Sequence, residues 1–215
     1  MEDYKRNQIE EALSRVFGED SKEPSPDLRS RVKRLLDADR ALGRNPRSSD
    51  PEKSTFAFYS VEPPGKGAEV RFSSYEAFAI LTALRLMRHA WPQSFPVSVL
   101  RRVRSKLEQE HARILRQDPE ILFDEKAIRA RARPGDLAVD NTDPVFLVVV
   151  SGQKGSSADV AGLMLFDICR GLESVYKFVG QHAAEAWSLF ELVTPAHYLE
   201  HHLAKTEPKK RGRGA

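Results

Sequence analysis

Apolar residues recur at helical spacing in the first forty residues of the chain, which predicts two amphipathic helices. The first, over residues 5–17, has one apolar face, made of Ile9, Leu13, Val16 and Phe17, and stops at Gly18. A polar break over residues 19–26 follows, in which Ser25 can cap the next helix and Pro26 suits its first position.

The second helix, over residues 26–43, is the most basic element of the pattern. Its buried side is predicted to carry Leu28, Val32, Leu35, Leu36 and Leu42, and Gly43 is suited to end it. The opposite side carries Arg29, Arg31, Lys33, Arg34 and Arg40.

The pattern then changes from helical spacing to alternation over residues 56–72. Phe56 and Phe58 on one run, and Val70 and Phe72 on the other, alternate with smaller or polar residues around the turn 63–67, which predicts a hairpin. Ser73 or Ser74 caps a third helix that ends before Pro92, and a fourth runs from about Pro96 to Gln117.

The second half of the chain alternates short strand and helix patterns. A charged stretch over 118–143, with a possible helical arm at 119–131, precedes a buried strand over 144–152. Residues 160–180 resemble a strand followed by a helix, 186–193 a strand, and 194–205 a helix. The predicted class is α+β, with domains at 1–117 and 144–204, a linker or arm at 118–143 and a disordered basic tail at 205–215.

Composition and charge narrow the functional classes. The single cysteine, Cys169, rules out an intrachain disulfide, and no apolar run approaches the ~20 residues of a membrane span. We therefore expect a cytoplasmic protein that does not bind a membrane. Net charge is +5 over residues 1–134, −6 over 135–204 and +4 over 205–215. This asymmetry favours a polyanion-binding N-terminal segment joined to an acidic module. Segments of like charge also arise on solvated surfaces that bind nothing.

The order of the N-terminal elements resembles a winged helix-turn-helix, and more narrowly the head of MerR-type regulators. In this resemblance LRSRVKRLLDADRALGR (28–44) stands where the recognition helix would be. The run EVRFSSYEAFAILTALRLMRHAW (69–91) stands for the wing's return strand and the next helix, and QSFPVSVLRRVRSKLE (93–108) for the helix after that. The resemblance implies a DNA-binding transcriptional regulator. We expect it to be nucleoid-associated and, because one winged helix reads few bases, dimeric.

The candidate contacts with double-stranded DNA come from the basic helix, the hairpin and the tail. They are Arg29, Ser30, Lys33, Arg34, Arg44, Lys66, Arg71, Lys209, Lys210, Arg211 and Arg213. On the fourth helix, a phosphate clamp by Arg101, Arg102 and Arg104 competes with a solvated basic face. The Arg-Gly-Arg core of the tail is similar to an AT-hook, and suits a narrow minor groove or a less specific electrostatic contact.

Two other functions stay open beside the regulator. The same scaffold could serve as a protein-interaction adaptor, or as a nucleoid-type binder without sequence preference. We expect no enzyme and no cofactor, because the chain carries no complete catalytic or phosphate-binding motif. We also expect no metal site, because the pair His197 and His201 lacks a supporting ligand pattern, and Cys169 reads as a core residue.

Overall fold

The computed structural model describes residues 3–19, 23–63, 69–89, 91–132, 137–151, 164–182 and 186–208. The protein is of the α+β class, as the sequence predicts, and its contacts divide it into two compact units. Unit 1 comprises residues 1–102 and 198–215, and unit 2 comprises residues 103–197. The domain limits suggested by the sequence stay a prediction.

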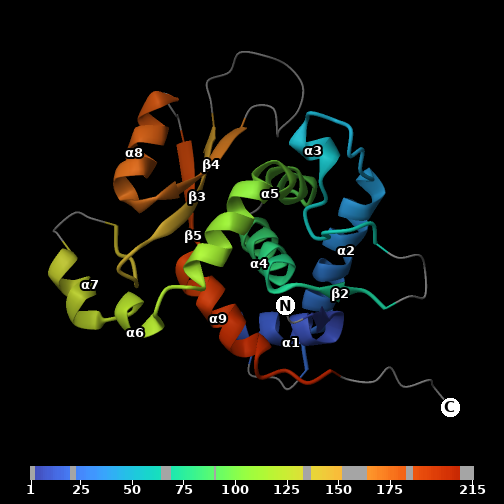
Figure 1. Ribbon diagram of the computed structural model, residues 1–215, viewed down its shortest axis with the longest axis horizontal. Coiled ribbons are helices and arrows are strands. Elements are labelled where there is room, and N and C mark those ends of the chain that lie inside the picture. The colour runs from blue at the N-terminus through green and yellow to red at the C-terminus, as the bar shows by residue number, and fades with distance from the viewer. Residues whose placement is uncertain are drawn as a thin grey trace. The chain divides into compact units, whose positions relative to one another are not determined.

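Unit 1 is a helical unit with one short pair of strands (Figure 1). In chain order its elements are β1 (Tyr4–Lys5), α1 (Arg6–Val16), α2 (Pro26–Leu42), α3 (Pro51–Ser54), β2 (Arg71–Phe72), α4 (Ser74–Arg88), the start of α5 (Ser94–Ile114) and the end of α9 (Val193–Leu203). Helix α2 packs against α1 and α4, and β1 pairs with β2 in antiparallel fashion.

Helix α4 forms the centre of unit 1. Its N-terminus has the predicted cap: Glu76 N–H donates to Ser73 Oγ, and Ser73 N–H donates to Glu76 Oε2, which is a capping box. Residues 75–84 are all buried. A helix that is apolar almost all round is stable only when other elements cover it, so α4 requires the neighbours that surround it.

A buried ion pair fixes α2 to α5. Arg101 of α5 donates from Nε to Asp39 Oδ1 at 2.6 Å, and the two residues are 2% and 0% exposed. The remaining guanidinium hydrogens bind backbone carbonyls of Asp39, Gly43 and Glu52 at 2.5–2.9 Å. The Asp39 carboxylate also accepts the N–H groups of Ala57 and Phe58, at 3.1 and 3.0 Å.

These hydrogen bonds explain why the first strand of the predicted hairpin is absent. Residues 56–63 form no strand. The Asp39 carboxylate accepts the N–H groups of the adjacent residues Ala57 and Phe58, which in a regular strand would point to opposite sides. The return strand exists as β2, but it pairs with β1 at the N-terminus. Phe56, Phe58 and Phe72 are buried as expected, whereas the predicted turn at 63–67 lies almost entirely outside the described residues.

Two further expectations about the helices are wrong. On α5, neither the phosphate clamp nor the solvated basic face fits all three arginines, because Arg101 and Arg104 are 2% and 7% exposed, while Arg102 is exposed and pairs with Glu52. Leu42, expected in the core, is 62% exposed. It is the last residue of α2 and follows Asp39, the last buried residue of that helix.

Unit 2 contains a three-stranded antiparallel sheet (Figure 1). Its elements are the end of α5, α6 (Pro119–Leu122), α7 (Glu125–Arg131), β3 (Val145–Ser151), β4 (Met164–Arg170), α8 (Gly171–Gln181), β5 (Ala186–Glu191) and the start of α9 (Val193–Leu203). The strand order is β4-β3-β5, so α8 crosses from one edge strand to the other. The strands and helices predicted here are confirmed.

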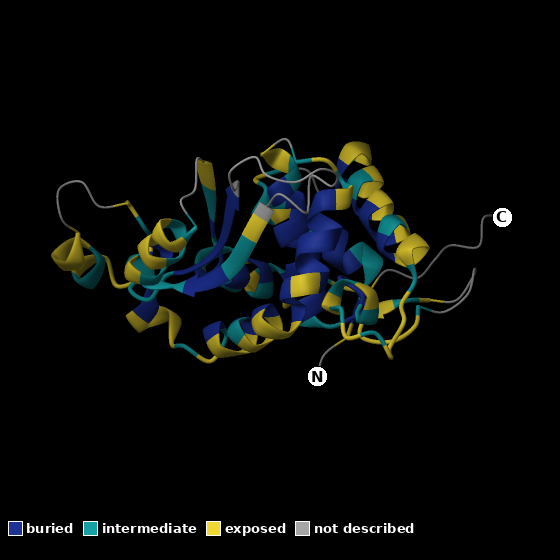
Figure 2. Ribbon diagram, turned by 90° about the horizontal axis from the view of Figure 1, so that it is seen from above, coloured by how far each residue is buried: buried dark blue, intermediate teal, exposed yellow. Residues whose placement is uncertain are grey.

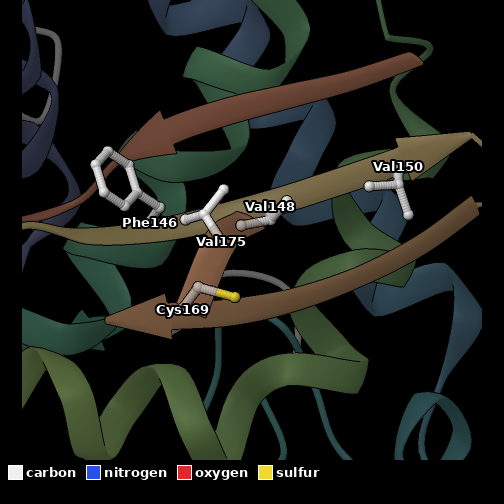
Figure 3. Close-up of a cluster of buried hydrophobic side chains, with 5 residues drawn as sticks. All are labelled: Phe146, Val148, Val150, Cys169 and Val175. Atoms are coloured by element: carbon white, nitrogen blue, oxygen red, sulfur yellow. The ribbon is translucent and has the colours of Figure 1, made fainter. Parts of the chain in front are cut away.

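The central strand β3 is buried on both faces. Phe146, Val148 and Val150 form one cluster with Cys169 of β4 and Val175 of α8 (Figure 3). The alternate side chains of β3 are also buried, so the run 145–150 is core. Figure 2 shows this buried strand as dark blue. No described helix is long and apolar enough to cross a bilayer.

We predict that Arg101→Ala lowers the free energy of unfolding by about 3–5 kcal/mol, because it leaves the Asp39 carboxylate buried without its partner. Denaturant unfolding of the full chain, followed by the fluorescence of Trp91 in a Trp187→Phe background, measures the change in unit 1. The neighbouring Arg102→Ala, which removes a partly exposed pair with Glu52, should change stability by less than about 1 kcal/mol. Equal effects of the two substitutions would contradict this role of Arg101.

We predict that unit 2 loses stability in mild acid. Burial, and then the neighbouring His197, lower the pKa of His111 from 6.5 to about 4. The unfolded state therefore takes up the proton first, and the contribution is complete above pH 6.5 and lost as pH falls towards 4. The expected loss is about 3 kcal/mol. Urea titrations at several pH values, read from Trp187 in a Trp91→Phe background, should show a flatter pH dependence for His111→Gln and an unchanged one for His201→Gln.

Candidate nucleic-acid interface

Helix α2 presents one apolar face to the core and one basic face to solvent. Leu28, Val32 and Leu35 are at most 5% exposed. Arg29, Ser30, Lys33 and Arg34 are all exposed, and we call these four residues the basic face of α2. The structure therefore places together the four residues that the sequence selected on this helix.

Two cations of the basic face have no carboxylate partner among the described residues. Arg29 pairs with Glu23 at 3.3 Å, and the adjacent Arg31 pairs with Asp27 at 2.8 Å. Lys33 makes no ion pair with a described residue, and Arg34 Nε only approaches the carbonyl of Ser30, at 3.4 Å. Lys33 and Arg34 thus present positive charge to solvent, where an anion can meet it.

The N-terminus of α2 is fixed by a small hydroxyl–carboxylate network. Ser25 Oγ accepts the N–H of Leu28 at 3.2 Å, and Pro26 occupies the first helical position. Glu19 in turn accepts hydrogen bonds from Ser14 and Ser25, of which the Ser14 hydroxyl contributes most to lowering the pKa of Glu19. With Asp39 bound near the other end, α2 is held at both ends.

Two side chains from outside α2 reach its basic face, and the sequence did not reveal them. Arg6 Nη2 donates to the carbonyl of Arg29 at 3.1 Å, and Gln93 Nε2 donates to the carbonyl of Arg34 at 2.7 Å. Arg6, which also pairs with Glu10 at 2.7 Å, brings a second guanidinium to the backbone of Arg29. No local pattern could have indicated these contacts, because Gln93 lies 59 residues from its partner.

Guanidinium groups also stack on an aromatic cluster near the C-terminus of α2. Arg40 lies 5.9 Å from the ring centre of Tyr59, and Arg44 lies 5.5 Å from that of Phe56. Burial raises the pKa of Tyr59 to about 12, so its hydroxyl stays protonated at neutral pH. Arg44 is exposed while its side chain packs on Phe56, which orders a cation close to the end of the basic helix.

The other predicted contacts are less well defined by the structure. Arg71 is exposed on β2, opposite Lys5, which pairs with Glu69 at 2.8 Å. Lys66 and the tail residues Lys209, Lys210, Arg211 and Arg213 lie outside the described residues. The DNA-contact role of the whole predicted set stays a prediction.

Other chemistry has little support in the described part of the chain. No group of three or more histidine, cysteine, aspartate or glutamate side chains is arranged there to hold a metal ion. His197 Nε2 lies 3.2 Å from the carbonyl of Ile114, and His201 Nε2 lies 2.6 Å from Lys205 Nζ. Burial raises the pKa of the Cys169 thiol, which makes it a weak nucleophile at neutral pH.

Comparison with known proteins gives no family for this chain: no family model, no curated protein and no solved structure matches it.

We predict that Lys33→Ala and Arg34→Ala leave the free energy of unfolding within about 0.5 kcal/mol of the unsubstituted chain, because both side chains are exposed and neither has a carboxylate partner among the described residues. Thermal and denaturant unfolding measure this directly. A loss above about 1 kcal/mol for either variant would show that the side chain supports the fold and would weaken its assignment to a binding surface.

Proposed function

We propose that the protein is a DNA-binding transcriptional regulator whose α2 lies in the major groove of duplex DNA. The observation that carries the proposal is the exposed pair Lys33 and Arg34, which have no carboxylate partner in the described part of the chain and lie on a helix held at both ends. Arg is the usual reader of guanine, through two parallel hydrogen bonds, and Lys contacts phosphate as a point charge.

The basic face also has the composition of a nucleic-acid contact surface. Ser30 supplies a hydroxyl for phosphate or base edges between the cations, and Arg6 and Arg44 supply guanidiniums in the same unit. The order α1, α2, β2, α4 is compatible with a winged helix-turn-helix in which β1 replaces the first hairpin strand. Arg71 and Lys66 would then belong to the wing.

A dimer is the expected functional form. A single recognition helix contacts few base pairs, whereas two half-sites about one DNA turn apart raise both affinity and specificity. In unit 2, Leu165 and Trp187 are each 44% exposed and both lie opposite Val150 in the sheet register. They form an apolar row on one face of the sheet, which supports self-association through unit 2.

A second candidate function is an interaction adaptor, in which unit 1 binds another protein. The observation in its favour is the exposure of two apolar residues of unit 1, Leu42 at 62% and Val61 at 71%. An exposed aliphatic side chain such as Leu42, which lies between Arg40 and Arg44 in the sequence, suits a protein contact. Because scattered exposed apolar residues are common on proteins, this candidate ranks second.

We predict that Arg34→Ala weakens binding to a selected duplex by about 1–3 kcal/mol and relaxes its base preference at one position, whereas Lys33→Ala weakens all duplexes alike. The lysine substitution should also reduce the slope of log affinity against log salt by about 1. Selection from a random duplex pool, followed by anisotropy titrations at two salt concentrations, supplies both measurements.

The matched control is Arg129→Ala, which removes one exposed arginine in unit 2 and therefore the same charge. Its affinity should stay within a factor of two of the unsubstituted chain. Failure to bind any duplex at low salt would sink the DNA proposal and favour the adaptor. Binding with no enriched motif, and with equal losses for Lys33→Ala and Arg34→Ala, would favour a binder without sequence preference.

A further inference from the structure

A cleft of about 190 Å³ in unit 1 is lined by residues from the end of α1, the first turns of α2 and the end of α4. Part of its lining is apolar: Leu28 and Leu84 are 5% and 2% exposed, and Phe17 is partly buried. An apolar cavity of about 150 Å³ can hold one benzene ring. The cleft therefore has room for a ligand with one small ring or a short branched chain.

Arg88, the last residue of α4, brings a positive charge to this cleft. It is exposed, and among the described residues no carboxylate pairs with it. Its guanidinium carbon lies 5.0 Å from the ring centre of Phe17. Stacking uses the flat face of a guanidinium, whereas its N–H groups lie in the plane of the group. These N–H groups stay available to a carboxylate, which a guanidinium binds through two parallel hydrogen bonds.

The two carboxylates that line the cleft are already bonded within the protein. Glu19 accepts three hydrogen bonds from Ser14 and Ser25, at 2.7–3.1 Å. Asp27 pairs with Arg31 at 2.8 Å. A cationic ligand would have to displace these internal partners, whereas an anion meets the available guanidinium. The same two carboxylates repel a dianion such as phosphate more than a monoanion, so the lining favours a single negative charge.

Hydrogen bonds hold the walls of the cleft in place before any ligand binds. Phe17 follows the last residue of α1, and its N–H donates to the carbonyl of Leu13 at 3.0 Å. The bonds between Glu19 and Ser25 tie the end of α1 to the N-cap of α2, and α2 packs against α4. A preformed site loses little conformational entropy when it binds a ligand, so a small set of contacts suffices.

We propose that this cleft binds a small monocarboxylate with an apolar ring or branched chain. The carboxylate binds Arg88, and the apolar body packs on Phe17, Leu28 and Leu84. The bound molecule contacts α1, α2 and α4 at once, and therefore stabilises unit 1 by mass action. This inference goes beyond the proposed function, and it does not depend on whether α2 binds DNA.

The test uses benzoate as the probe and follows backbone amides of the full chain by ¹⁵N NMR. Benzoate should give saturable shifts that concentrate at the cleft, at Phe17, Leu28, Leu84 and Arg88. Benzyl alcohol keeps the ring without the charge, and acetate keeps the charge without the ring. Each should bind about tenfold more weakly than benzoate or worse, because each lacks one of the two contacts.

Substitutions of the guanidinium separate carboxylate recognition from binding in an apolar cleft. Arg88→Gln should weaken benzoate about tenfold or more, because it removes two charge-assisted hydrogen bonds. Arg88→Lys keeps the charge but not the paired geometry, so its affinity should lie between the two. The matched control Arg47→Gln removes another exposed arginine of unit 1 and should leave the affinity for benzoate unchanged.

Three results would overturn the inference. Equal affinities for benzoate and benzyl alcohol would show an apolar cleft that does not recognise a carboxylate. An unchanged affinity in Arg88→Gln, with a spectrum that stays well dispersed, would remove the proposed anchor. Shifts that do not saturate, or that centre on residues outside the cleft, would show that benzoate has no specific site there.

Discussion

The buried ion pair between Asp39 and Arg101 is the interaction on which unit 1 depends. Removing two charges from water is costly, and the attraction between them compensates only when the remaining polar atoms are also bonded. Here the carboxylate accepts two backbone N–H groups besides the guanidinium, and the guanidinium binds three carbonyls. The pair therefore positions α2, α5, the residues after α2 and the segment around Phe56 together.

The same pair explains where local sequence reasoning succeeds and fails. Helix α2 was predictable because Ser25, Pro26 and Gly43 mark its ends and its leucines repeat at helical spacing. Nothing local distinguishes Arg101 from Arg102, although one is buried and the other exposed. The missing hairpin strand has the same origin. The alternation of Phe56 and Phe58 predicts their burial correctly, but the Asp39 carboxylate, 18 residues before Ala57, accepts the backbone N–H groups of Ala57 and Phe58.

In unit 2 the secondary structure could be predicted more fully from the sequence. Strand β3 is a continuous apolar run, and polar or glycine-containing segments separate it from the elements that follow. The candidate site divides in a similar way. The basic face of α2 could be predicted, since it lies on one helix and follows from helical spacing. Its reinforcement by Arg6 and Gln93 could not, because both contacts join distant parts of the chain.

Like charges on the basic face of α2 destabilise the helix that carries them. Arg29 and Lys33 are four residues apart and repel each other by a few tenths of a kcal/mol, an effect that Glu23 beside Arg29 and Asp37 one turn after Lys33 reduce. Neutral side chains at these positions would remove that repulsion without disturbing the buried face. The helix tolerates the repulsion because its caps, its leucines and the ion pair at Asp39 stabilise it from the opposite side. An anionic partner such as the duplex DNA proposed above would account for this cationic helix face.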